Sequence, residues 1–105
     1  MEEQLHQDKT FEKIKYPNKA IKGREFEGCV FKNCDFSNGD FSHNRFTDCE
    51  FVGCNLAMLR LSGSTLNNVT FRECKLTGID FSACEEFLFT VRFESCMMDY
   101  TSFLK

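Results

Sequence analysis

The chain has 105 residues, enough for one domain, and a formal net charge of -3. This mildly acidic balance, without a basic stripe, argues against direct nucleic-acid binding, and no apolar run is long enough to span a membrane. Residues 1–9 are polar and charged, unlike a signal peptide, so we expect the seven cysteines to be reduced thiols in the cytoplasm.

Large apolar residues recur at every fifth position of the chain. This spacing matches neither a helix, with a period of about 3.6, nor a plain strand, with a period of about 2. It fits a backbone that turns a corner every five residues, so it indicates a solenoid. We call these residues the centres; in chain order they are Phe11, Tyr16, Ile21, Phe26, Phe31, Phe36, Phe41, Phe46, Phe51, Leu56, Leu61, Leu66, Phe71, Leu76 and Phe81.

The residue two places before each centre, which we call the small position, is mostly small or apolar. Residues two apart on an extended segment point to the same side, so the centre and the small position should share the interior. Between residues 29 and 84 the small positions hold Cys29, Cys34, Gly39, Asn44, Cys49, Cys54, Leu59, Ser64, Val69, Cys74, Ile79 and Cys84. Five of the six glycines fall two residues after a centre, where a corner needs a permissive backbone.

The first part of the chain follows this pattern poorly. Its small positions hold Lys9, Ile14, Lys19 and Arg24, three of which are charged. We therefore expect residues 1–24 to form a tail, which includes His6, and an irregular first coil that caps the core. Residues 25–105 are expected to form the repeat domain.

The five-residue frame breaks once, after Phe81. The next centre would be Glu86, which is charged, and the pattern resumes at Leu88 and Phe93. Two extra residues should therefore lie within residues 84–87. They could form a bulge that places Glu85 and Glu86 in solvent, or a protrusion that touches a partner.

The repeat resembles the pentapeptide repeat family, whose consensus is small, Asp or Asn, Leu or Phe, polar, polar. The matching stretches are residues 34–38, 39–43 and 79–83, and the resemblance extends over residues 11–105. It implies an all-β, right-handed quadrilateral β-helix with 20 residues per coil and about four to five coils. Residues twenty apart should then stack, with the coils about 4.8 Å apart.

This arrangement predicts a core of stacked centres with thiols between them. The cysteines are interpreted as small, weakly polar fillers rather than metal ligands, because a metal would need several converging thiolates. The expected core consists of Phe31, Phe36, Phe41, Phe46, Phe51, Leu56, Leu61, Leu66, Phe71, Leu76, Phe81, Leu88, Phe93, Cys29, Cys34, Cys49, Cys54, Cys74, Cys84 and Cys96.

The last residues form an apolar end without a polar cap. Met98, Tyr100, Phe103 and Leu104 lie there, so we expect end-to-end self-association, or a longer rod of which this chain is a fragment. The resemblance adds that related proteins often dimerise through their C-terminal ends, commonly with a terminal helix, which does not follow here.

No arrangement of residues indicates an enzyme or a cofactor site. His6 and His43 have no catalytic partner at a fixed spacing, and no Gly-rich phosphate loop is present. We therefore expect a non-enzymatic protein without cofactor or metal.

Three functions remain open. The first is a rigid scaffold that binds another protein. The second follows from the resemblance, since some family members mimic DNA and bind a type II topoisomerase (DNA gyrase or topoisomerase IV), conferring quinolone resistance; here, however, no stacked column is uniformly acidic. The third is a spacer within a longer repeat protein.

Overall fold

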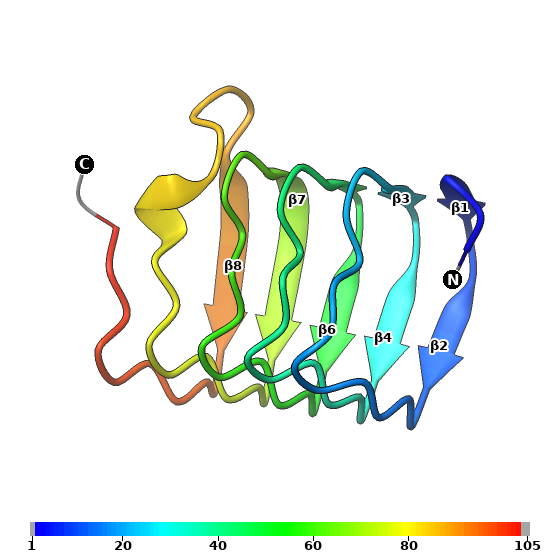
Figure 1. The fold of residues 1–105 in the computed structure, drawn as a ribbon. Helices are drawn as coiled ribbons and strands as arrows, with labels where there is room; N and C mark the ends of the chain where they lie inside the picture. Colours follow the sequence, from blue (N-terminus) through cyan, green and yellow to red (C-terminus); the bar gives the residue numbers. More distant parts are fainter. Residues whose placement is uncertain (1, 104–105) are drawn as a thin grey trace.

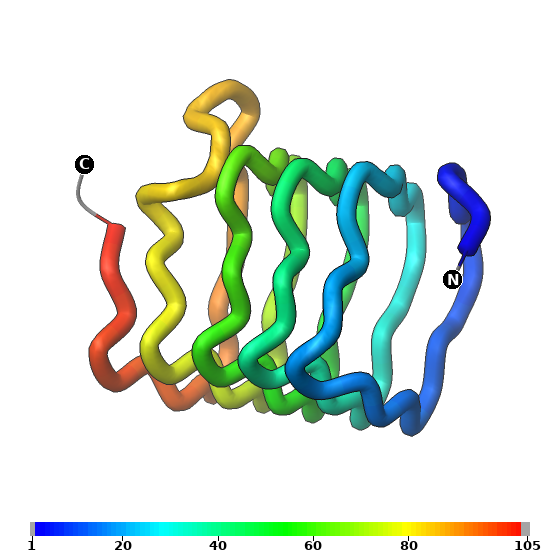
Figure 2. The backbone as a smooth tube through the Cα atoms, viewed as in Figure 1, coloured from blue at the N-terminus to red at the C-terminus, as the bar shows by residue number. Residues whose placement is uncertain are grey.

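The computed structural model describes residues 2–103 as a parallel β-solenoid of about four turns, which confirms the predicted fold (Figure 1). Successive coils stack side by side from one end of the molecule to the other (Figure 2). Most strands are only three residues long; they are β1 (Leu5–Gln7), β2 (Thr10–Glu12), β3 (Glu25–Glu27), β4 (Val30–Lys32), β5 (Arg45–Thr47), β6 (Glu50–Val52), β7 (Thr65–Arg72) and β8 (Thr90–Glu94). Among the described residues the one helical element is a single 3-10 turn, η1 (Phe81–Ala83).

Parallel backbone pairing joins each residue to its counterpart one coil later. β1 pairs with β3 so that His6 lies opposite Phe26, twenty residues on. The strand order in the sheet is β1-β3-β5-β7-β6-β4-β2, and β8 pairs with β7. The two sides without strands keep the same spacing through single bridges, such as that between Asp35 and Asn55. The spacing of the repeat thus becomes the pitch of the solenoid.

The core is a set of ring columns that run along the axis. In the longest aromatic column, Phe11, Phe31, Phe51, Phe71 and Phe93 stack nearly parallel. The centroids of the Phe31 and Phe51 rings are 4.5 Å apart, with an interplanar angle of 7°. This distance follows from the strand spacing of about 4.8 Å, because rings on paired residues repeat with the backbone.

The burial of the centres decreases towards the first coil. Phe11 is only partly buried and Tyr16 is 37% exposed. Of the fifteen predicted centres, the buried ones are Ile21, Phe26, Phe31, Phe36, Phe41, Phe46, Phe51, Leu56, Leu61, Leu66, Phe71, Leu76 and Phe81.

The small positions donate hydrogen bonds to the preceding coil. The thiols of Cys54 and Cys74 lie 3.3 Å from the carbonyl oxygens of Phe31 and Phe51, respectively. Ser64 fills the same role with its hydroxyl, 2.6 Å from another centre carbonyl. The other thiols in such contacts belong to Cys29, Cys34, Cys49 and Cys96. These thiols therefore satisfy backbone carbonyls as well as fill space.

Residues in the left-handed conformation form the corners, two places after each centre from Phe11 to Leu76. Five glycines have a positive φ there, between 63° and 78°. Asn33, Asn38 and Asn68 adopt the same conformation, for which Asn is well suited. Met58 and Leu88 do so as well, although their side chains disfavour it.

The expectation of an irregular first coil with His6 in a tail is wrong. β1 and β2 pair in register with β3 and β4, so the backbone pattern does not change at residue 24. His6 is 1% exposed and stacks on Phe26 with a centroid distance of 4.9 Å. It therefore occupies a centre, five residues before Phe11, although its side chain is not apolar.

The placement of Leu88 in the core is also wrong. Leu88 is 48% exposed, and Phe89 packs against the core in its place. The cause lies in the strand register, because Asn67 pairs with Thr90 whereas Val69 pairs with Val91. Compared with a coil of twenty residues, the chain therefore has three extra residues before Phe89 and one residue fewer at the following corner.

Replacing Phe31 by alanine should lower the free energy of unfolding by about 3–5 kcal/mol, because it removes a fully buried ring from the longest column. Urea denaturation of both proteins measures the change. The exposed Ser62 gives a matched control, and Ser62→Ala should change stability by less than about 0.5 kcal/mol. Similar losses in both variants would contradict the stacked core.

Candidate protein-binding surface

The frame break produces a loop that projects from the side of the solenoid between η1 and β8 (Figure 1). We call residues 85–89 the 85–89 loop. Its first residue still follows the twenty-residue register, because the Glu85 amide donates to the Ser64 carbonyl at 2.8 Å, as the Thr65 amide does to the Asn44 carbonyl one coil earlier. At its other end Phe89 returns to the core. The loop is thus fixed to the stack on both sides.

A tight turn closes the loop. The Phe89 amide donates to the Glu86 carbonyl at 3.2 Å, and the Thr90 hydroxyl lies 3.3 Å from the Leu88 carbonyl oxygen. Leu88 has a φ of 60°, in a turn position that favours Gly or Asn. A leucine here costs conformational energy, of order 1–3 kcal/mol.

The tip of the loop combines apolar and acidic side chains. Phe87 is 75% exposed and Leu88 is 48% exposed. The predicted partner-binding residues Glu85 and Glu86 also lie at the surface. Phe87 was not among the predicted site residues. Its position within the interruption of the repeat is the feature of the sequence that could have identified it. A hollow of about 250 Å³ lies under the loop, lined by Phe81, Ser82, Cys84, Glu85, Glu86, Phe89 and Phe103.

The side of the solenoid that leads to this loop is acidic. Within β1, β3, β5 and the corners after them lie the carboxylates of Asp8, Glu25, Glu27 and Asp48, and a single cation, Arg45. We call this side the acidic face. It continues to the loop because Thr90 pairs with Asn67 on the same side.

Carboxylates on the other sides of the solenoid also have local partners. Arg72 joins Glu50 and Glu94 at 2.5 and 3.1 Å, across three coils. Asp35 accepts from the amide and hydroxyl of Ser37, which hold the pKa of this carboxyl below its usual value. On the acidic face the four carboxylates share one arginine, Arg45, which lies in register opposite Glu25.

The thiols and His43 do not converge on a metal site in the described part of the chain. Among residues 2–103 no three His, Cys, Asp or Glu side chains converge as a metal site. Burial raises the pKa of the Cys49 thiol to about 12, which favours the neutral form at physiological pH. His43 is an exposed corner residue with a φ of 62°.

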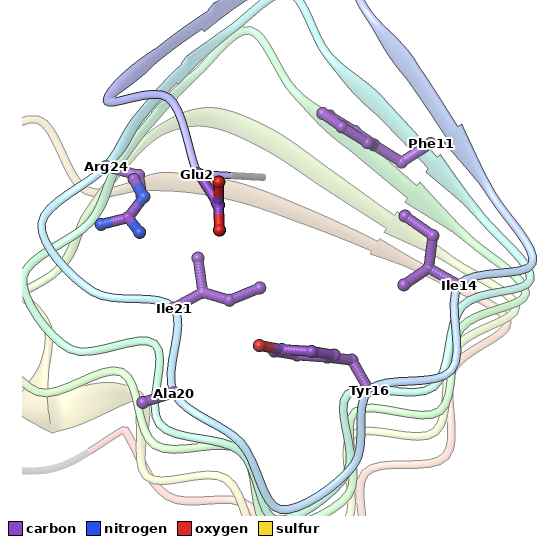
Figure 3. A pocket seen from close by; sticks show the side chains of 7 residues that line it. All are labelled: Glu2, Phe11, Ile14, Tyr16, Ala20, Ile21 and Arg24. Carbon is purple, nitrogen blue, oxygen red and sulfur yellow. The ribbon is translucent and has the colours of Figure 1, made fainter.

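The first coil surrounds a cavity of about 390 Å³ (Figure 3). Its apolar lining comes from Phe11, Ile14, Ile21 and Tyr16. Glu2 and Arg24 lie across the cavity from Phe11 and Ile14. Two of its lining residues, Ile14 and Arg24, hold small positions of this coil.

The predicted association end is only partly apolar at the surface. Tyr100 is 90% exposed and Phe103 49% exposed, whereas Met98 packs partly against the core. Leu104 lies outside the described residues. No helix within residues 2–103 is long and apolar enough to cross a membrane.

Comparisons with known proteins agree with this architecture. A model of the pentapeptide repeat region matches residues 24–103. No curated protein matches the sequence.

Several solved structures are similar to this chain over most of its length. Full-length QnrB1, a plasmid-mediated fluoroquinolone resistance protein, is 20% identical over 88% of this chain and 59% of its own, with a TM-score of 0.48. A trypsin-treated QnrB1 variant is 19% identical, with coverages of 88% and 57% and a TM-score of 0.48. Rfr23 from the cyanobacterium Cyanothece 51142 is 9% identical, with coverages of 94% and 90% and a TM-score of 0.39. The chain thus spans just over half the length of QnrB1.

Proposed function

The chain belongs to the pentapeptide repeat family, and from this premise we propose that it is a non-enzymatic scaffold that binds another protein through the 85–89 loop. The observation that carries the proposal is the exposed Phe87 on a loop anchored at both ends. We place this role in the cytoplasm, where the thiols stay reduced.

A partner would gain more from Phe87 than from any other loop residue. Burying a phenylalanine ring is worth about 1.5–3 kcal/mol, and aromatic anchors commonly dominate interfaces. The loop is already ordered by the Glu85 and Phe89 backbone bonds, so little conformational entropy is lost on binding.

The left-handed Leu88 supports the same role. Gly or Asn would fit this backbone with less strain, so the leucine does not serve the turn itself. Its exposed side chain instead enlarges the apolar tip beside Phe87. Met58 has the same conformation at an ordinary corner, so the exposure of Leu88, and not its φ, supports the proposal.

The acidic face favours a second candidate, a DNA mimic that binds a type II topoisomerase. Asp8, Glu25, Glu27 and Asp48 would replace phosphates there, although Arg45 lies among them. A third use, as a spacer in a longer protein, needs neither the loop nor this face.

Replacing Phe87 by alanine should weaken partner binding by at least about thirtyfold, the effect of losing about 2 kcal/mol at an interface anchor. A photo-crosslinking residue at position 87 identifies the partner in cells, and calorimetry with the purified partner then measures affinity. Met58→Ala is the matched control, because Met58 is also an exposed corner residue, 52% accessible, but lies outside the loop. Equal affinity of Phe87→Ala and the unaltered chain would reject the loop as the binding site.

Replacing Leu88 by glycine should separate stability from binding. Relief of the left-handed strain, partly offset by the entropy of glycine, should raise the free energy of unfolding by about 1 kcal/mol. Loss of the apolar side chain should weaken the same partner. A variant that is more stable and binds equally well would show that Leu88 takes no part in recognition.

The topoisomerase candidate predicts that the purified chain competes with DNA for gyrase and reduces supercoiling. Reversal of charge in Glu25→Lys with Glu27→Lys should abolish the effect, since these carboxylates stand for phosphates. Titration of the chain into a supercoiling assay at several DNA concentrations measures the competition. Unchanged supercoiling at micromolar protein would remove this candidate and leave the loop proposal intact.

A further inference from the structure

His6 is a buried imidazole at one edge of the solenoid. It stacks on Phe26 at an interplanar angle of 10° and meets the edge of Phe11 at a centroid distance of 5.6 Å. Its side chain occupies the position held by phenylalanine in the next two coils of the same column, at Phe26 and Phe46. The strand that carries it, β1, ends the strand order of the sheet.

The contact of His6 with the Lys9 ammonium favours one tautomer. The Lys9 ammonium lies 3.1 Å from Nδ1 and can only donate, so Nδ1 is the acceptor and the proton resides on Nε2. Nε2 has no hydrogen-bond partner within the described part of the chain. A buried N–H without an acceptor weakens the coil that contains it.

Protonation would add a second unfavourable feature. A proton on Nδ1 would break the bond from Lys9 and place two cations in contact, within a pocket of phenylalanine rings. Burial first, and then the Lys9 charge, lower the pKa of His6.

The other charges near His6 do not reverse this effect. The Glu3 backbone, through a hydrogen bond, and then the Glu3 carboxylate act in the opposite direction, but each has a smaller effect than burial or the Lys9 charge, and the carboxylate also pairs with Lys9 at 3.4 Å. On the facing strand β3, Glu25 and Glu27 flank the ring of Phe26, and Glu27 accepts from Gln7 at 2.9 Å. The neighbouring β2 contributes Phe11 to the pocket, between Thr10 and the exposed Glu12.

We propose that His6 makes the first coil, residues 5–24, a pH-sensitive segment that detaches from the solenoid in mild acid. The neutral imidazole is compatible with the ring stack, whereas the imidazolium is better solvated in the open state. Opening would break the bonds from the Asp8 amide to Glu27 and from the Glu25 amide to Gln4. It would also uncover Phe26 and the edges of β3 and β4, which could then pair with another extended segment.

The sign of the pH dependence follows from the lowered pKa. The open coil binds a proton more readily than the closed coil, so closure is favoured above the ordinary pKa of about 6.5. Its stability then falls as the pH drops from about 6.5 through the lower pKa of the closed state. The rest of the solenoid holds no second buried histidine among the described residues.

Amide exchange followed by NMR tests the proposal residue by residue. Between about pH 7.5 and about pH 5, the protection factors of the Asp8 and Glu25 amides should fall by at least about tenfold, after correction for intrinsic rates. The Thr65 amide, bonded to Asn44 in an interior coil, is the internal control and should change little. The His6 ring resonances should titrate below about pH 6.5.

Two variants separate the imidazole from the coil itself. His6→Phe retains a stacked ring without a titrating group, so its Asp8 and Glu25 protection should not depend on pH in this window. Lys9→Met removes the opposing cation and should raise the His6 titration midpoint. Unchanged protection in the unaltered chain, an equal fall in His6→Phe, or a His6 midpoint at or above about 6.5 would overturn the proposal.

Discussion

The pairing of each backbone segment with the segment twenty residues later is the constraint on which the structure depends. Because it fixes the register, a side chain must share its environment with the side chains directly above and below it. The 4.5 Å contact between the Phe31 and Phe51 rings, the bridge from Asp35 to Asn55 and the ion pairs of Arg72 all follow from this one repeat distance. The coil therefore converts local spacing in the chain into long-range contacts.

The same register explains the unusual choice of residues between the centres. A donor at the small position meets the carbonyl of a centre in the coil before it, as Cys54 meets Phe31 and Ser64 meets Phe41. A thiol, a hydroxyl or the amide of Asn44 can all serve, whereas the buried Leu59, Val69 and Ile79 fill the same position without a donor. The abundance of cysteine is thus a packing and hydrogen-bonding property of the fold.

Much of this architecture could be predicted from the five-residue period, since period, stacking and corner positions are geometrically linked. The exceptions have physical reasons. Counting back five residues from Phe93 predicts Leu88 as a core residue. In the structure, however, the corner opposite Asn68 has one residue fewer than the repeat requires, and composition alone does not reveal this deletion. Counting back from Phe11 leads to His6, which the emphasis on apolar centres passed over. The candidate site could be predicted only in part for a similar reason. The charged Glu85 and Glu86 reveal where the repeat is interrupted, whereas the exposure of Phe87 depends on the turn that the backbone forms there.

The residue lost opposite Asn68 has a structural consequence for the coils that follow. Beyond it, Phe93 again faces Phe71 and Met97 again bridges to Lys75, so every later side chain keeps its orientation despite the longer chain. The solenoid can thus accommodate extra length at one corner without rotating its remaining surfaces. A recognition segment can in this way change its size and sequence while the rod that carries it stays the same.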